Sequence, residues 1–452
     1  MTEKQPAKIL MLGWEFPPHI SGGLGVACLG MTRALAERGH PITFVLPRVK
    51  QGMSNEAPVD LLGVNQFPVP SARPPAMGAM LAGISPGLSI HTIDSLLSPY
   101  MTEESYQLTR SVYQQRMAGE RQGGERGDVP ASVVGDVSGD YGPDLMAETL
   151  RYAAVVGEIA AGVEHDVIHC HDWLTMLAGI RARQVSGRPL VVHVHALEFD
   201  RSGEHVNQLV YDIEKHGMEQ ADRVVAVSHY TRDTIIRRYG IDPAKITVVH
   251  NAVDRSHSPV PLPAPRRNGR QRDKVVLFLG RITFQKGPDY FIEAAARVLK
   301  KKENVRFVMA GSGDMTRRMI ERVAALKMGT RFHFTGFLRG AALERIFRES
   351  DVYVMPSVSE PFGISPLEAM YHDVPVIISR QSGVAEVLHH ALKVDFWDVE
   401  ALADRILALL NHGKLHEEIV RQGSKELKAI QWSNAAHHLH DVYNQARERS
   451  IQ

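Results

Sequence analysis

The chain contains only two cysteines, Cys28 and Cys170, and no long hydrophobic run. Two cysteines in apolar stretches do not form the disulfide framework of small secreted domains, so we expect a reducing, cytoplasmic compartment. No apolar stretch approaches the roughly 20 residues that span a bilayer, so we expect no integral membrane segment. The first residues, MTEKQPAKILMLG, are too polar ahead of their apolar run to be a signal peptide.

An excess of charge of one sign is also missing. The formal net charge of the 452 residues is +1, so nothing in the overall charge attracts nucleic acid or an acidic membrane surface. Hydrophobic residues make up 44% and charged residues 23%, as in ordinary soluble globular proteins. At about 150 residues per domain, the length predicts two or three domains with sizeable cores.

Short apolar runs alternate with amphipathic stretches in the first half of the chain. Such runs predict buried strands of a parallel sheet covered by helices on both faces. They lie at residues 8–12, 42–46, 167–170, 190–195, 223–227 and 246–249. The region from about 100 to 143 breaks the alternation because it is rich in glycine and charge. We interpret it as an irregular insertion, either a binding loop or a decoration.

A proline-rich stretch at residues 256–273 separates this half from a second one. Its four prolines and basic tail predict a semi-rigid linker. The alternation then restarts, with apolar runs at residues 275–279, 305–309, 332–334, 352–354 and 374–378, and it ends in helices from about residue 398. The pattern predicts an α/β protein with two doubly wound, Rossmann-like domains facing across a cleft. We place the domains at residues 1–255 and 274–432.

Two carboxylates, Glu360 and Glu368, lie in the segment PSVSEPFGISPLEAM of residues 356–370. A strand-like run precedes this segment and a helix-like run follows it, and ligands of open α/β sheets bind at such a junction. Backbone N–H groups at a helix start suit a phosphate, and the carboxylates can accept hydrogen bonds from hydroxyls, so a nucleotide sugar would fit. Alternatively, Ser365, Pro366 and Glu368 form a capping box in which Glu368 only closes the helix.

Two glycines follow the first predicted strand of the first domain, and two cations follow the first predicted strand of the second. Gly22 and Gly23 allow a backbone to approach a phosphate closely, or they simply form a tight turn. Arg281 and Lys286 can hold a diphosphate and offset the charge of a leaving nucleoside diphosphate. Ordinary surface cations in a loop are the alternative.

Histidines recur at spacings of two in the first half. His169 with His171, next to Asp172, and His193 with His195 point the same way if they lie on strands, and such sets can bind a metal ion. A metal-dependent hydrolase therefore stays open as an alternative. Against it, these motifs can end strands without converging, and the second domain would have no role.

Together these segments resemble the retaining glycosyltransferases of the two-domain GT-B fold, and more narrowly the type 1 glycosyltransferases with their glycogen synthase-like branch. The resemblance covers most of the chain outside the insertion. It rests on residues 14–18 (WEFPP), 22–25 (GGLG), 171–173 (HDW), 195–199 (HALEF), Arg281 with Lys286, and 360–368 (EPFGISPLE). One departure is Ile20, which stands where bacterial glycogen synthases of the ADP-glucose type carry a lysine.

The resemblance implies a role for each candidate residue. The residues that it makes catalytic are His195 under the donor sugar, Glu360 facing that sugar, and Arg281 and Lys286 on the diphosphate. Further contacts to the donor are implied for Gly22, Gly23, Phe362, Gly363, Ile364 and, on the ribose hydroxyls, Glu368. Asp172 would lie on the acceptor side. A terminal helix of residues 433–452 would cross back to the first domain.

The implied activity is that of a retaining hexosyltransferase that needs no metal and no cofactor. It would move a sugar, with glucose the first candidate, from a UDP- or ADP-sugar to an α-glucan or another carbohydrate acceptor. Alternatives are a lipid-linked or small-molecule acceptor, and a catalytically silent sensor of sugar nucleotides.

Overall fold

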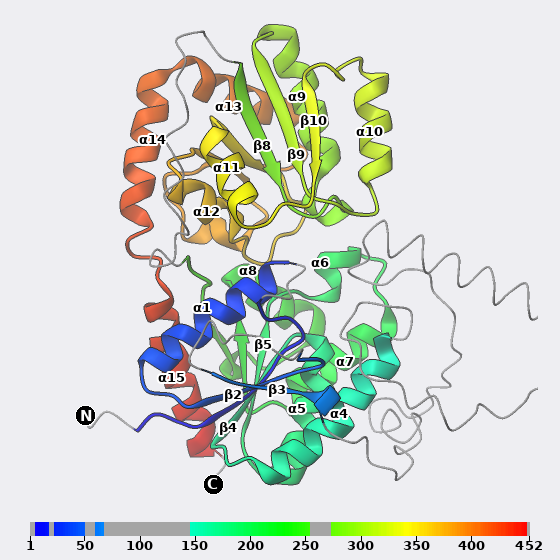
Figure 1. Ribbon diagram of the computed structural model, residues 1–452, viewed down its shortest axis with the longest axis vertical. Coiled ribbons are helices and arrows are strands. Elements are labelled where there is room, and N and C mark those ends of the chain that lie inside the picture. Colours follow the sequence, from blue (N-terminus) through cyan, green and yellow to red (C-terminus); the bar gives the residue numbers. More distant parts are fainter. Residues whose placement is uncertain (1–4, 18–21, 50–58, 67–144, 254–272, 450–452) are drawn as a thin grey trace, which may run out of the picture. The chain divides into compact units, whose positions relative to one another are not determined.

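The computed structural model describes residues 5–17, 22–49, 59–66, 145–253 and 273–449 (Figure 1). The predicted insertion at 100–143, Ile20 and nearly all of the predicted linker lie outside these residues. The chain divides into two compact units. Unit 1 comprises Met1–Ala226, Arg232–Val249 and Ala435–Gln452, and unit 2 comprises Val227–Thr231 and His250–Asn434.

Unit 1 contains a seven-stranded sheet with the strand order β3-β2-β1-β4-β5-β6-β7, in which neighbouring strands are parallel. Its strands are β1 (Ile9–Leu12), β2 (Ile42–Leu46), β3 (Asp60–Gly63), β4 (Val167–His171), β5 (Leu190–Val194), β6 (Arg223–Ala226) and β7 (Ile246–Val248). The helical elements in this part of the chain are α1 (Gly23–Glu37), η1 (Val64–Gln66), α4 (Leu145–Gly162), α5 (Trp173–Ser186), α6 (Glu198–Ser202), α7 (Gln208–Gln220), α8 (His229–Thr234), the π-helical η2 (Ile235–Tyr239), η3 (Pro243–Lys245) and the last helix α15 (Trp432–Arg449).

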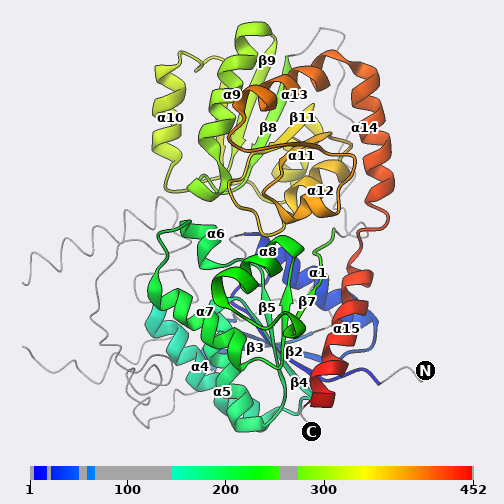
Figure 2. The same cartoon turned by 180° about the vertical axis from the view of Figure 1, so that it is seen from behind.

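The first sheet is buried on both faces, as its continuous apolar strands predict. Alternate residues such as Leu10, Ile168 and Val192 join α4, α5 and α7 in one core. The intervening residues, among them His169, face the other side, where Tyr443 of α15 bonds to the His169 ring. Figure 1 and Figure 2 show these helices on the two sides of the sheet.

Unit 2 contains a six-stranded parallel sheet with the order β10-β9-β8-β11-β12-β13. Its strands are β8 (Lys274–Leu279), β9 (Val305–Ala310), β10 (Phe332–Gly336), β11 (Val352–Met355), β12 (Val376–Ser379) and β13 (Leu392–Val394). Its other elements are η4 (Phe284–Lys286), α9 (Pro288–Lys301), α10 (Thr316–Ala325), α11 (Ala341–Glu349), α12 (Ser365–Tyr371), η5 (Gly383–Glu386), α13 (Val399–Asn411) and α14 (Gly413–Glu426). One core packs α9, α10 and α13 against the sheet, and a second packs α11 and α12 against its other face (Figure 2).

The prediction of two doubly wound α/β domains is confirmed. Most strand boundaries agree within one or two residues, and β2 agrees at both ends. The short strands β3 and β13, at or near the sheet edges, were not predicted, because neither has a run of apolar residues long enough to stand out. Among the described residues, no helix combines the length and apolar character needed to cross a membrane.

Candidate active site

The strand order of unit 2 reverses between β8 and β11. The chain runs outward from β8 through β9 to β10, and then continues on the other side of β8 with β11. In doubly wound sheets, ligands bind outside the carboxyl ends of the strands at this reversal. Arg281 and Lys286 follow β8, and Glu360 and Glu368 follow β11. The sheet topology therefore gathers the four predicted charged residues of this unit at one edge.

Lys286 forms an ion pair with Glu360. Glu360 is nearly buried, and its Oε2 also accepts a hydrogen bond from Ser357 Oγ at 3.2 Å. An ammonium group has three N–H donors, so the pair leaves Lys286 able to donate to a further acceptor. The Glu360 backbone is fixed too, because its carbonyl accepts from Gly383 N at 2.9 Å.

Glu368 lies in the first turn of α12 and is partly buried. Among the described residues, no hydrogen bond or ion pair reaches its carboxylate. Burial, with a smaller contribution from Glu344, raises its pKa to about 7. The capping-box alternative is wrong, because α12 begins at Ser365 with Ile364 as its N-cap and with no side-chain cap hydrogen bond. Ser365 Oγ instead contacts Tyr353 Oη at 2.7 Å.

Tyr353 was not singled out from the sequence, and it occupies a buried position in β11. Its hydroxyl donates to the Leu279 carbonyl at 3.3 Å, at the end of β8. Burial, Glu360 and Glu368 together raise the pKa of Tyr353, so both carboxylates act on this one hydroxyl. Tyr353 thus connects the end of β8 to the start of α12 beneath the predicted site.

The loop that contains Phe362, Gly363 and Ile364 is held by close backbone packing. Gly363 has φ +95, a conformation that favours glycine, and a Cβ there would lie 3.1 Å from Glu360 Cγ. The Phe362 carbonyl accepts from Val384 N at 2.8 Å. The side chain of Phe362 is buried, so any contact of this residue with a ligand would come from its backbone.

In unit 1 the strand order reverses between β1 and β4. The connection after β1 leads to α1, which begins at Gly23 with Gly22 as its N-cap and has no side-chain cap hydrogen bond. A Cβ built on either glycine meets no described atom within 4 Å. Packing among the described residues therefore does not require glycine here, whereas close approach of a ligand to the helix start would.

Asp172 follows β4 at the same edge, with φ 58 and ψ 175. This conformation is rare for any residue other than glycine and has to be stabilised by its surroundings. The carboxylate provides that stabilisation by accepting from the backbone N–H groups of His195 at 2.6 Å and Ala196 at 3.2 Å. Burial raises its pKa to about 6, although Arg201 opposes the shift. The side chain placed on the acceptor side by resemblance is thus directed into the protein.

The paired histidines converge, contrary to the argument that they can end strands apart. His171 and His193 are register partners on β4 and β5. His169 Nε2 lies 3.2 Å from His193 Nδ1, and His171 Nδ1 lies 2.9 Å from His195 Nε2. Burial lowers the pKa of all four rings, to about 3 for His169 and His195. The cluster is therefore a ladder of neutral imidazoles, and it fixes the ring of His195.

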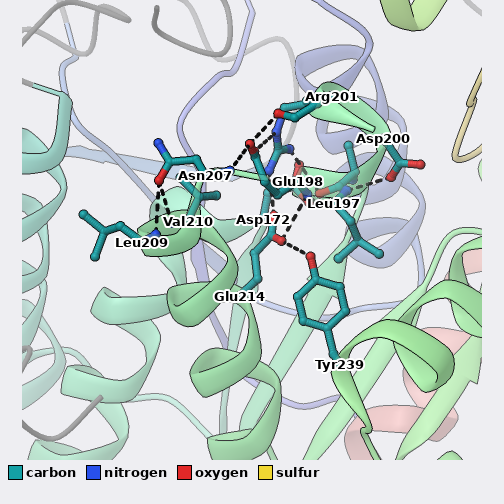
Figure 3. Close-up of polar contacts among 12 residues, drawn as sticks. Asp172, Leu197, Glu198, Asp200, Arg201, Asn207, Leu209, Val210, Glu214 and Tyr239 are labelled. Carbon is teal, nitrogen blue, oxygen red and sulfur yellow. Dashed lines mark hydrogen bonds and ion pairs between the residues drawn. The ribbon is translucent and has the colours of Figure 1, made fainter. Parts of the chain in front are cut away.

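A buried charged cluster, Glu198, Arg201 and Glu214, supports the turn that follows His195 (Figure 3). Arg201 bonds to Glu198 Oε2 at 3.1 Å and to Glu214 Oε1 at 2.6 Å, and it donates to the Ala196 carbonyl at 3.3 Å. Glu214 also accepts from the Tyr239 hydroxyl and from Glu198 N at 3.1 Å. None of these side chains except Glu198, in the HALEF segment, was singled out from the sequence. Their spacing in α6 and α7 resembles that of ordinary surface charges.

Comparisons with known proteins agree with this architecture. Residues 264–426 match the family described as Glycosyl transferases group 1, and residues 114–257 match Glycosyltransferase Family 4. An uncharacterised glycosyltransferase of Methanocaldococcus jannaschii is 26% identical over 98% of this chain and 99% of its own length. A glycogen synthase of Mycobacterium tuberculosis is 24% identical over 97% of this chain and 95% of its own.

A similar solved structure is that of Anabaena HepE in complex with UDP and glucose. It has a TM-score of 0.66 at 17% identity, and the match covers 96% of this chain and 98% of the other. At this identity the likeness shows the fold. The family matches set aside the metal-dependent hydrolase that the histidine pairs left open. The chain belongs to the type 1 glycosyltransferases of the GT-B fold, which transfer sugars from nucleotide-sugar donors.

Proposed function

We propose that the chain is a retaining hexosyltransferase that moves glucose from a nucleoside-diphosphate glucose to an α-glucan. The observation that carries the donor site is Glu368, a partly buried carboxylate without a described partner at the strand-order reversal of unit 2. Vicinal ribose hydroxyls are donors that such a carboxylate can accept from. The relative named glycogen synthase and the neighbour that holds UDP and glucose favour the sugar and the acceptor.

The reaction breaks the bond between the anomeric carbon and the diphosphate oxygen, and it forms a bond to an acceptor oxygen on the same face of the sugar. The proton of the acceptor hydroxyl passes to the departing phosphate. Arg281 and Lys286 stabilise the charge that develops on that phosphate. His195 and Glu360 hold the sugar, and no metal ion is needed, so chelation by EDTA leaves the rate unchanged.

Replacement of Lys286 tests the role of the cations. Lys286→Ala removes a charge that interacts with the leaving group, so kcat/KM falls on the order of 10²–10³-fold. The matched control is Lys274→Ala, because Lys274 pairs with Asp351 at 3.0 Å in the same unit but at the amino end of β8. Rates are measured as nucleoside diphosphate released, with and without glycogen. Equal rates for the two variants would remove Lys286 from the mechanism.

Donor binding is measured separately, by thermal shift with UDP, ADP, GDP and their glucose conjugates. A nucleotide that binds only the folded state raises the Tm. Glu368→Gln weakens binding of the nucleoside diphosphate by about 10- to 100-fold, the effect of one or two hydrogen bonds to a charged group. Glu417→Gln, on an exposed face of α14, leaves it unchanged. If turnover occurs only with a small-molecule or lipid-linked acceptor and not with glycogen, that acceptor takes the place of the α-glucan in the proposal.

A further inference from the structure

A second group of possible metal ligands lies in unit 2. His229, His250 and Glu386 each offer one ligand atom, and these atoms lie within 4.8 Å of one another. They come from three separate segments: the first turn of α8, the stretch after β7, and the end of η5. Two imidazoles and one carboxylate are a common ligand set for zinc and related divalent metals.

The carboxylate of Glu386 is already held in one orientation. It accepts from His229 N at 2.9 Å and from Tyr230 N at 2.7 Å, and the ring Nε2 of His250 lies 3.0 Å from Oε2. Backbone donors that orient a ligating carboxylate strengthen metal sites, because the ligand need not be ordered when the ion binds. Each carboxylate oxygen has two lone pairs, so these hydrogen bonds leave a position for a metal.

Exposure distinguishes this group from the histidine ladder of unit 1. His229 is exposed, and the side chains of His250 and Glu386 are 31% and 24% exposed, so an ion can enter from solvent. His169, His171 and His193 also have ligand atoms close together, but they are fully buried and contribute no negative charge. A divalent ion without an anionic ligand is costly to place in such an interior. The group in unit 2 is the better candidate on both counts.

The geometry requires only a small rearrangement. Ligands at about 2.0–2.1 Å from a tetrahedral zinc ion are about 3.3 Å apart. The widest separation in this group is within 4.8 Å, so the side chains need to close by about 1.5 Å at most. Rotation of the exposed His229 ring provides this movement. We propose that His229, His250 and Glu386 bind zinc or a similar divalent transition metal, with water at the open position.

This site is independent of the proposed transfer reaction and supplies no catalytic group to it. The chain passes from unit 1 to unit 2 at two places in the sequence, at Val227 and at His250. His229 lies just after the first of these places, and His250 lies at the second. A bound metal ion would link the segments that contain His229 and His250 to Glu386 of η5.

Direct binding to the folded, untagged chain tests the proposal. Zinc titration by calorimetry gives stoichiometry and affinity, and cobalt(II) gives visible absorption bands that report nitrogen and oxygen ligands. We expect one strong site, weakened by about 10- to 100-fold in His229→Asn, His250→Asn and Glu386→Gln. Glu386→Gln keeps an oxygen acceptor for the backbone N–H groups. His229 is exposed, so its replacement leaves the fold intact.

The matched control is His333→Asn, which removes an exposed histidine of the same unit on β10. Loss of affinity in the three ligand variants but not in this control supports the site. Unchanged affinity in His229→Asn and His250→Asn would assign the metal to other histidines and overturn the proposal. Absence of a strong site in the unmodified chain would overturn it as well. Neither result bears on sugar transfer.

Discussion

At the carboxyl edge of the first sheet, Asp172 accepts hydrogen bonds from two backbone N–H groups of its own unit. At the same edge of the second sheet, Glu368 has no partner among the described residues. Both carboxyl groups have a raised pKa because of burial, but only the first has internal hydrogen bonds that offset part of this effect. Similar topological positions are thus used in opposite ways.

The difference extends to the surroundings of each residue. Around Asp172, the imidazole ladder positions the ring of His195. Arg201, held by Glu198 and Glu214, donates to the Ala196 carbonyl in the turn that follows His195. Buried networks whose charged groups are all paired, as in the Glu198–Arg201–Glu214 cluster, make one conformation rigid. An unpaired partly buried carboxylate instead lowers stability, and such groups concentrate where a ligand supplies the missing partner. We infer that the turn after His195 in unit 1 is rigid, whereas Glu368 in unit 2 is a carboxylate that a ligand can pair with.

Arg201→Met is expected to cause the largest loss of stability, and it tests whether the cluster in unit 1 is rigid. Both partners of Arg201, Glu198 and Glu214, are at most 5% exposed, so loss of the guanidinium leaves two buried carboxylates without their cation. Removing one member of a buried ion pair destabilises a protein by about 3–5 kcal/mol. Urea unfolding of the full chain, followed by tryptophan fluorescence and by circular dichroism, measures the change in the free energy of unfolding.

The matched control is Lys215→Met on α7, the helix that carries Glu214. Lys215 lies 3.9 Å from Glu219, with both side chains more than 40% exposed, and such pairs contribute about 0.5 kcal/mol or less. If the two variants lose equal stability, the cluster is not the rigid support that we infer.

Replacement of glutamate by glutamine should change the free energy of unfolding in opposite directions at Glu214 and Glu368. Glu214→Gln places an amide N–H₂ against the donors Arg201, Tyr239 and Glu198 N, so we expect a loss of about 2–4 kcal/mol at pH 8. Glu368→Gln removes a partly buried charge that pairs with no cation among the described residues, so we expect a gain of about 1 kcal/mol. Chemical unfolding of both variants beside the unmodified chain gives the two signs. A loss of stability in Glu368→Gln would mean that this carboxylate has a structural role.

The pH dependence follows from the same carboxylate. The pKa of Glu368 is about 7 in the folded chain against an ordinary 4.5, so the folded state retains a proton that the unfolded state releases. Its contribution to stability is complete below about pH 4.5 and is lost as the pH rises through about 7. Glu368→Gln should therefore match the unmodified chain near pH 4.5 and exceed it above pH 7. Parallel stability curves over this range would contradict the raised pKa.

The features that the sequence predicted are those carried by periodicity and by position at strand ends. Apolar runs locate β1, β2, β4 and β8 because buried parallel strands need continuous apolar residues. Arg281, Lys286, Glu360 and Glu368 were found because each lies in a loop after such a strand or in the helix turn that follows it. Which of these charges pair with each other depends on side-chain packing, and the Lys286–Glu360 pair could not be derived from spacing.

The side chains that support the turn after His195 in unit 1 were not predictable in the same way. Arg201 and Glu214 are 13 positions apart on two helices, and in sequence they look like the charges of a solvated helix face. The four histidines of the ladder were noted in the sequence, but their convergence was not predicted, for a different reason. Whether His171 and His193 meet depends on the register of β4 against β5, which the local sequence does not determine.

The smallest effect is expected from Asp172→Asn. Asparagine tolerates a positive φ better than most residues, and its side-chain oxygen can accept from the N–H groups of His195 and Ala196, so we expect a change within about 1 kcal/mol. Asp172→Ala leaves both N–H groups without that acceptor and should cost about 1–3 kcal/mol. The pKa of Asp172 is about 6 against an ordinary 3.8, so its stabilising contribution is lost as the pH rises through 6, and the asparagine variant should not show this loss. Equal stabilities of the asparagine and alanine variants at pH 8 would show that the carboxylate does not hold the turn after His195, and the contrast with Glu368 would then disappear.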